Sequence, residues 1–236
     1  MLPLAFENVY FAIGGRTIIR ELTLEIRSGP RSVILGPNGA GKSVLLRLCH
    51  GLLKPTNGRI VWRGHANGSR PRQQAMVFQR PVMLRRSAFA NVTYALALAG
   101  VSRRERELRT DDVLEGVGLS HVAHRPARVL SGGEQQKLAL ARAWALGPEV
   151  LFLDEPTANL DPGSTRDVET IVGQIRAGGT KIVMTTHNLG QARRLGDEIL
   201  FLSQGRLVER APVAQFFQQP KSAEAAAFIR GELPWS

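Results

Sequence analysis

The sequence predicts an α/β fold, in which helices flank a parallel sheet, antiparallel strands form its edge and a helical segment is inserted. Three observations predict it. Short apolar, β-branched runs alternate with helical stretches, as in a parallel sheet covered on both faces. Near the N-terminus Leu22, Leu24 and Ile26 alternate with polar residues, and residues 200–207 turn at Gln204-Gly205, so antiparallel strands are expected there. Finally, residues 80–130 are rich in Ala, Leu and Arg, which indicates the inserted helical segment.

The expected elements are short and bounded by Gly, Pro, Asn or polar clusters. We expect parallel strands at residues 32–35, 75–78, 150–153, 181–184 and 199–202, and helices at 42–53, 135–146, 165–176 and 189–195, with a short helix after Pro220 that ends near Gly231. We predict one domain over residues 1–236. Residues 1–79 and 131–236 would form its core with the antiparallel part, and about 80–130 its helical subdomain.

Composition limits the class of protein. Of the 236 residues 43% are apolar, which suits a globular core. No apolar run approaches the roughly 18 residues of a membrane span, and the N-terminus does not resemble a secretory signal, so we expect a cytoplasmic protein. The single cysteine, Cys49, agrees with a reducing compartment. The net charge is +11, and no acidic residue occurs between Glu25 and Glu105. This charge either attracts anionic partners or only keeps the protein in solution.

A glycine-rich loop follows the first parallel strand and precedes a helix. It reads Gly36, Pro37, Asn38, Gly39, Ala40, Gly41, Lys42, Ser43, the P-loop pattern G-x-x-x-x-G-K-[ST]. Glycines let backbone N–H groups converge on phosphate oxygens beside the positive end of the helix dipole. Lys42 would add a charge at the outer phosphates, and the Ser43 hydroxyl would bind Mg²⁺. A tight turn between strand and helix explains the glycines but leaves Lys42 and Ser43 unexplained.

Two acidic residues, Asp154 and Glu155, end the apolar strand that begins at Val150. The carboxyl ends of such strands are where α/β sheets present ligand groups. In a P-loop enzyme Asp154 would hold Mg²⁺, which leaves Glu155 as the base that polarises an attacking water. An acid pair that merely solvates a loop is the alternative.

A second glycine pair lies in Leu130-Ser131-Gly132-Gly133-Glu134, at the start of a helix. Ser131 and Glu134 have the spacing of a capping box, which alone would account for them. The glycines cost about 1 kcal/mol each against alanine in a helix. Close approach of a phosphate to the helix N-terminus would explain them, and predicts a second phosphate-contacting element.

With these three elements in this order, the sequence resembles the ATP-binding subunits of ATP-binding cassette (ABC) transporters over nearly its whole length. The resemblance implies a P-loop NTPase sheet that hydrolyses ATP with Mg²⁺. It also implies a homodimer in which each ATP lies between one P-loop and the partner's Ser131–Glu134.

The same resemblance assigns further residues. Gln79 corresponds to a residue that senses Mg²⁺ and the attacking water, Asn159 to Asp161 to a loop at the dimer interface, and His187 to the residue that contacts the terminal phosphate and orients the base. Many family members stack an aromatic residue on adenine where this chain has Ile13. Either Phe11 or Tyr10 would replace it, or apolar contact alone would hold the base.

The resemblance also implies partners. The chain would dock as a peripheral protein on the cytoplasmic side of the plasma membrane, to separate permease subunits served by a periplasmic or extracellular substrate-binding protein. We expect Val82, Met83 and Leu84 to meet the permease. The sequence around these motifs most resembles that of importers of tungstate, molybdate and phosphate, and the ending Gly231 to Trp235 favours tungstate.

Two alternatives have different functions. A soluble ABC-type ATPase that acts on nucleic acid or ribosomes would suit the basic charge, but it would carry two cassettes or a long coiled coil, so no nucleic acid is expected. A P-loop kinase or GTPase is not favoured, because neither would carry an element such as Leu130–Glu134. A GTPase would also carry a guanine-reading motif, which this sequence lacks.

Overall fold

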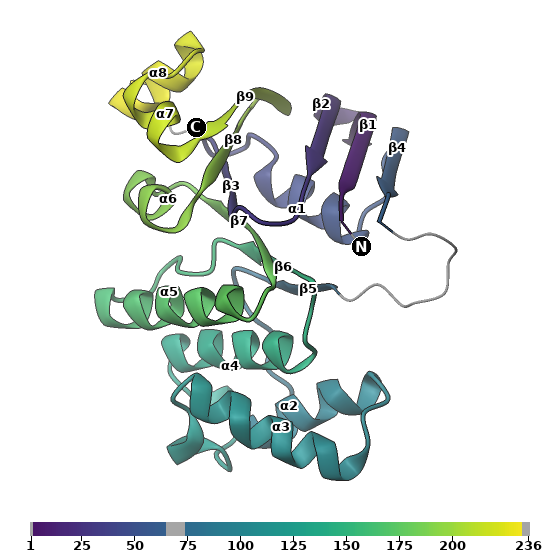
Figure 1. Ribbon diagram of the computed structural model, residues 1–236, viewed down its shortest axis with the longest axis vertical. Coiled ribbons are helices and arrows are strands. Elements are labelled where there is room, and N and C mark those ends of the chain that lie inside the picture. Colours follow the sequence, from purple (N-terminus) through teal and green to yellow (C-terminus); the bar gives the residue numbers. More distant parts are fainter. Residues whose placement is uncertain (1, 65–73, 233–236) are drawn as a thin grey trace. The chain divides into compact units, whose positions relative to one another are not determined.

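The computed structural model describes residues 2–64 and 74–232, so the C-terminal residues 233–235 that favoured tungstate lie outside the described part. Chain contacts divide the protein into two units. The first comprises Met1–Arg72, Phe152–Glu155 and Lys181–Ser236, and the second comprises Gln73–Leu151 and Pro156–Thr180. Figure 1 shows the α/β architecture predicted from the sequence, with parallel and antiparallel strands together.

The first unit contains the central strands. Within the larger sheet, β6 (Val150–Asp154), β7 (Lys181–Thr186), β3 (Ser32–Leu35), β8 (Glu198–Ser203) and β9 (Arg206–Pro212) follow one another in this order. β3 runs parallel to both β7 and β8, whereas β8 and β9 are antiparallel. Every residue of β3, β7 and β8 is buried, as expected of strands covered on both faces.

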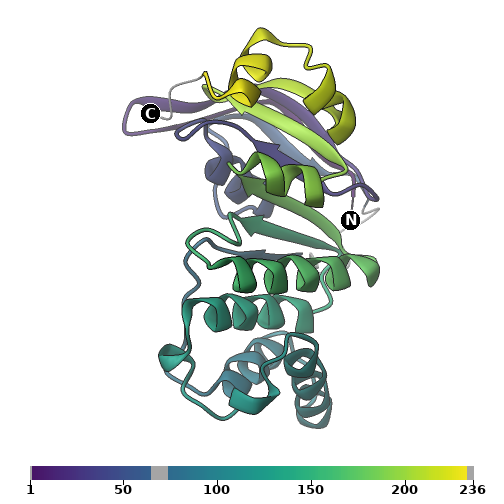
Figure 2. The same ribbon diagram turned by 90° about the vertical axis from the view of Figure 1, so that its left-hand side faces the viewer.

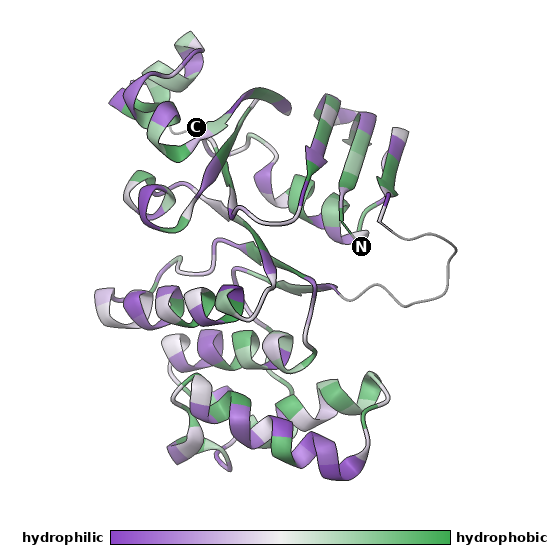
Figure 3. Ribbon diagram, in the orientation of Figure 1, coloured by the Kyte–Doolittle hydropathy of each residue, from purple (hydrophilic) through white to green (hydrophobic). Residues whose placement is uncertain are grey.

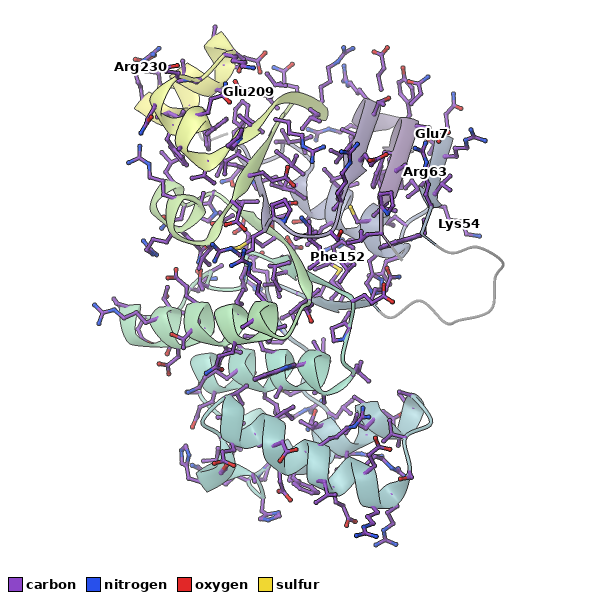
Figure 4. All side chains as sticks on the ribbon, viewed as in Figure 1. Glu7, Lys54, Arg63, Phe152, Glu209 and Arg230 are labelled. Atoms are coloured by element: carbon purple, nitrogen blue, oxygen red, sulfur yellow. The ribbon has the colours of Figure 1, made fainter. Side chains whose placement is uncertain are left out.

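The antiparallel part of this unit is a three-stranded sheet in the order β2 (Arg16–Ile26), β1 (Leu4–Ile13), β4 (Asn57–Trp62). In β2 the residues Ile19, Leu22, Leu24 and Ile26 are buried and most residues between them are exposed. On this sheet Glu7 and Arg63 point toward one another (Figure 4), and their side chains are 2.6 Å apart. The expected strands include neither β1 nor β4, and the exposed start of β4, Asn57-Gly58-Arg59, resembles a turn.

Helices of the first unit are α1 (Lys42–His50), α6 (Leu189–Leu195), α7 (Val213–Gln218) and α8 (Ala223–Arg230). Phe201 of β8 anchors the last two helices, since its ring centroid lies 5.7 Å from that of Phe216 and 5.3 Å from that of Phe228. The helix expected after Pro220 is therefore present. It ends at Gly231, whose φ of 76° is the left-handed conformation typical of helix ends.

The second unit contains β5 (Gln74–Val77), α2 (Ala88–Leu98), α3 (Arg103–Gly116), the short 3₁₀ helices at Ser120–Val122 and Ala127–Val129, α4 (Gly132–Ala145) and α5 (Pro162–Ala177). Helices α4 and α5 lie side by side in both views (Figures 1 and 2). Asp161 caps α5, with Pro162 as its first helical residue. The expected stretch 80–130 is indeed mostly helical, and its status as a separate subdomain stays a prediction.

Hydropathy distinguishes the helices of the second unit. Figure 3 shows α3 as largely hydrophilic, in agreement with its sequence RRERELRTDDVLEG, and shows green segments on α2. Within residues 2–64 and 74–232, none of the helices has both the length and the apolar character needed to cross a bilayer.

Candidate nucleotide site

The glycine-rich loop joins β3 to α1 in the first unit, as predicted. Gly39 and Gly41 have φ values of 75° and 98°, which glycine adopts without strain. Gly41 is the N-cap of α1, so the first free N–H groups of that helix face the loop. A Cβ on Gly41 would lie 2.9 Å from Ile19 Cδ1, and one on Gly36 would overlap the Leu202 carbonyl. The loop is thus fixed between β2 and the end of β8, and only glycine fits at these two positions.

Lys42 places its ammonium group inside this loop. Its Nζ donates hydrogen bonds to the carbonyl oxygens of Gly36, at 2.9 Å, and Pro37, at 3.0 Å. Burial lowers the pKa of Lys42, and the nearby carboxylates of Glu155 and Asp154 oppose that shift. Among the described residues, this buried cation hydrogen-bonds only to neutral carbonyls, which suits it to an incoming anion.

Ser43 and Asp154 meet although 111 positions separate them in the sequence. The Ser43 hydroxyl donates to Asp154 Oδ1 at 2.8 Å, and the Thr185 hydroxyl donates to the same oxygen at 2.8 Å. A hydroxyl and a carboxylate beside a phosphate-binding loop are the oxygen ligands that Mg²⁺ prefers. The predicted pair of metal ligands is therefore assembled in one place.

Glu155 lies directly after the buried strand β6 and has a φ of 45°. Its backbone N–H donates to Thr185 Oγ1 at 2.9 Å, which fixes this turn. Its Oε2 lies 3.0 Å from His187 Nδ1. Two residues that the sequence places 32 positions apart thus form the pair expected of a base and the group that orients it.

Thr185 is a residue that sequence reasoning missed. It contacts both the Asp154 side chain and the Glu155 backbone, and it is fully buried. The available signal was a pair of hydroxyl residues, Thr185-Thr186, at the end of an otherwise apolar strand. A buried hydroxyl needs a partner, so such a pair indicates polar neighbours at that strand end.

A cleft of about 720 Å³ opens over the loop, entirely within the first unit. Three cationic residues line it, Lys42, Arg16 and Arg20, against one acid, Glu155. Such a balance favours a polyanion of nucleotide size. The remaining lining residues come from the glycine-rich loop, the start of α1, β2 and the region of the β8–β9 turn: Thr17, Ile18, Pro37, Asn38, Gly39, Ala40, Gly41, Ser43, Val44, Ser203 and Gln204.

The second glycine pair begins α4 in the second unit. Ser131 and Glu134 form the complete capping box, and the backbone N–H and side chain of Ser131 lower the pKa of Glu134. The two glycines differ. A Cβ on Gly133 would lie 2.9 Å from Ser164 Cβ on α5 and closer still to its hydroxyl, whereas a Cβ on Gly132 would meet nothing within 4 Å. Packing therefore explains Gly133, and Gly132 alone still needs a ligand to explain it.

Other expected residues of the second unit have mixed outcomes. Gln79 follows β5, and its magnesium-sensing role stays a prediction. Asp161 accepts hydrogen bonds from Gly163 N and Ser164 N, so it has a capping role besides any at an interface. The expectation for Met83 was wrong, because only 6% of it is exposed, while Val82 is 72% exposed.

Comparisons with known proteins identify the family of this chain. Residues 19–158 match the family model described as ABC transporter. The phosphate import ATP-binding protein PstB 2 of Natronomonas pharaonis is 35% identical over 98% of this chain and 87% of its own length. The tungstate uptake system ATP-binding protein TupC of Peptoclostridium acidaminophilum is 37% identical over 88% of this chain and 98% of its own length. A solved dimeric ATP-binding cassette in a post-hydrolysis state, bound to ADP and Pi, has a TM-score of 0.78 at 26% identity, covering 89% of this chain and 98% of that one.

Proposed function

Since the chain belongs to the ABC transporter family as one of its ATP-binding subunits, and is thus an ATPase, we propose that Glu155 is its base and that hydrolysis drives import of an oxyanion. The observation that carries this proposal is the contact of 3.0 Å between Glu155 and His187, beside the cleft that Lys42 lines. The net reaction converts ATP and water to ADP and phosphate.

The proposed steps assign one task to each side chain. The Glu155 carboxylate accepts a proton from the attacking water, and His187 holds that carboxylate in orientation through Nδ1. Lys42 exchanges its two carbonyl partners for phosphate oxygens and so balances the charge that develops during phosphoryl transfer. Backbone N–H groups at the start of α1 bind the remaining oxygens.

The residues present fit Mg²⁺. The Ser43 hydroxyl and Asp154 Oδ1, which are 2.8 Å apart, would hold it, with Gln79 as the third residue that the sequence suggests. When bound, the ion neutralises phosphate charge and helps to align the reacting groups. Thr185 keeps Asp154 oriented by donating to the same carboxylate oxygen.

A dimer is proposed as the working unit, with Ser131–Glu134 of a second copy closing over each ATP. Two observations support it. Gly132 has open space where a Cβ would be, at the start of a capped helix. The cassette bound to ADP and Pi, to which this chain is similar, is dimeric.

Import with membrane partners is the proposed setting, at the cytoplasmic side of the plasma membrane, with separate permease subunits and an extracytoplasmic substrate-binding protein. The exposed Val82 is proposed to contact the permease. The cargo is proposed to be an oxyanion such as tungstate, since two similar proteins bear the names of phosphate import and tungstate uptake systems. Nucleic acid is not proposed as a partner, and salt-dependent DNA or RNA binding would contradict this.

Replacement of Glu155 tests the catalytic proposal. Glu155→Gln should lower the ATP hydrolysis rate by about 100-fold or more, because general bases contribute roughly 10² to 10⁴ in rate. Binding of MgATP should persist, since Lys42 and the loop are intact. Glu224→Gln, an exposed change on α8, is the matched control. Near wild-type hydrolysis by Glu155→Gln would remove Glu155 from its role.

A further inference from the structure

The cleft contains no aromatic side chain among the described residues that line it. Ile13, where an aromatic residue was expected, is 64% exposed and does not line the cleft. Phe11 is only 8% exposed and pairs with Ile19 across the β1–β2 hairpin, so it belongs to the core. Tyr10 is half-buried and also lies outside the lining. Neither of the two expected aromatic substitutes can therefore stack on a base held in this cleft.

Strand β2 provides one wall of the cleft, and its residues have a definite order along that wall. Ile18 lies next to the glycine-rich loop, since its Cγ2 would be 3.4 Å from a Cβ on Gly41. Arg20 lies beside the β8–β9 turn, because its backbone N–H donates to the Gly205 carbonyl at 2.9 Å. Arg16 begins the strand, about 7 Å before Ile18 on the same face, as strand geometry requires for residues two apart. The same turn also meets Ile18, since a Cβ on Gly205 would overlap the Ile18 carbonyl, so Arg16 lies farther from that turn along the strand than Ile18 and Arg20 do.

This order matches the parts of a nucleotide. With the phosphates at the loop and the start of α1, as proposed, the sugar would pass Ile18 and the base would reach Arg16, both of which line the cleft. The Arg16 side chain is available for this contact. Across residues 2–64 and 74–232 no ion pair or side-chain hydrogen bond holds it, whereas Arg31 of the same unit is fixed by Asp197 at 2.9 Å.

We propose that the guanidinium of Arg16 stacks on the base of the bound nucleotide and replaces the missing aromatic ring. This inference rests on the proposed ATP site. Guanidinium is planar, carries a delocalised charge and stacks on aromatic faces, so it can cover a purine much as a ring does. Ile18 adds apolar contact with the sugar. Stacking reads the face of a base rather than its edge, so ATP and GTP should bind with similar affinity.

Binding measurements with three ligands test this role, using calorimetric titration of the full chain with MgATP, MgGTP and Mg-tripolyphosphate. Arg16→Ala should weaken both nucleotides by about fivefold, the effect of one cation–π contact. Tripolyphosphate, which has no base, should bind the variant as it binds the wild type. Arg16→Trp should restore nucleotide binding, because it returns a stacking surface without a charge.

The control is Arg27→Ala, which removes the same charge outside the cleft and should alter none of the three affinities. Equal weakening of tripolyphosphate and ATP by Arg16→Ala would make Arg16 a phosphate ligand and overturn the proposal. So would unchanged nucleotide binding in this variant. Failure of the wild-type chain to bind either MgATP or tripolyphosphate would instead reject the nucleotide site itself, and the inference with it.

Discussion

Two buried lysines of the first unit, Lys42 and Lys181, lie at opposite ends of the central parallel strands. Lys181 begins β7 and donates to the Pro30 carbonyl and to Ser32 Oγ, at 2.7 Å for the latter, with Glu198 at 3.8 Å. Lys42 follows β3 and contacts only the carbonyls of Gly36 and Pro37. In the described part of the chain, Lys181 thus has its own counterion within ion-pair distance and Lys42 does not.

This difference separates a structural cation from a functional one. Burying a charge costs several kcal/mol unless a partner offsets it. Around Lys181 the cost is partly offset within the fold, since Arg210 and Ser32 also hold Glu198 in place, although burial still lowers the pKa of Lys181. Around Lys42 no carboxylate of the described residues lies within ion-pair distance, so a bound phosphate would supply the missing counterion. The counterion of Lys181 thus belongs to the fold, whereas that of Lys42 would arrive with the ligand.

Exchanging each lysine for methionine tests the comparison most strongly. Lys42→Met should lower ATP hydrolysis by more than about 100-fold, as removal of a transition-state donor does, while the free energy of unfolding changes little. Lys181→Met should lower the free energy of unfolding by about 3 kcal/mol, because it leaves Glu198 buried with fewer partners. Hydrolysis rates and urea unfolding of both variants measure this. If the two changes had similar effects on activity and on stability, the distinction between a functional Lys42 and a structural Lys181 would be contradicted.

The pH dependence of stability sharpens the same comparison. Burial lowers the pKa of Lys181 from 10.5 to about 8. Between these two values the unfolded chain binds more protons than the folded one, so the Lys181 contribution to stability rises with pH from about 8 to 10.5 and is constant below that window. The difference in free energy of unfolding between wild type and Lys181→Met should therefore rise by up to about 1.4 kcal/mol per pH unit. A flat difference across the window would show that Lys181 titrates normally.

The glycines at the start of α4 offer a smaller contrast of the same kind. Gly133→Ala should lower the free energy of unfolding by about 1 to 3 kcal/mol, because its Cβ would press on Ser164. Gly132→Ala should leave it unchanged or slightly raised, since its Cβ meets open space and alanine favours helices. Thermal unfolding distinguishes them, and Ser164→Gly should relieve the Gly133→Ala defect. Equal stability of both alanine variants would contradict the packing role of Gly133.

Much of this site follows from local sequence patterns. The loop at Gly36–Ser43 and the acids that end β6 are recognisable because glycine spacing and an apolar run are properties of adjacent residues. The role of Thr185 cannot be recognised in this way, since it depends on where β7 lies in the sheet relative to β6. The burial of Met83 cannot be recognised either, because its neighbours come from distant segments, such as Arg128, which donates to the Met83 carbonyl. The contrast between Lys42 and Lys181 likewise needs partners that only the fold brings together.

Each ATP is proposed to lie between the phosphate loop of one copy and Ser131–Glu134 of another. Mixing two inactive variants tests it directly. Lys42→Met disables the loop and Gly132→Asp disables the second glycine element, so each variant alone should be inactive. In a two-fold dimer that contains one copy of each, one site is intact, and an equal mixture should recover about a quarter of wild-type ATP hydrolysis. A mixture no more active than its separate components would contradict the shared site.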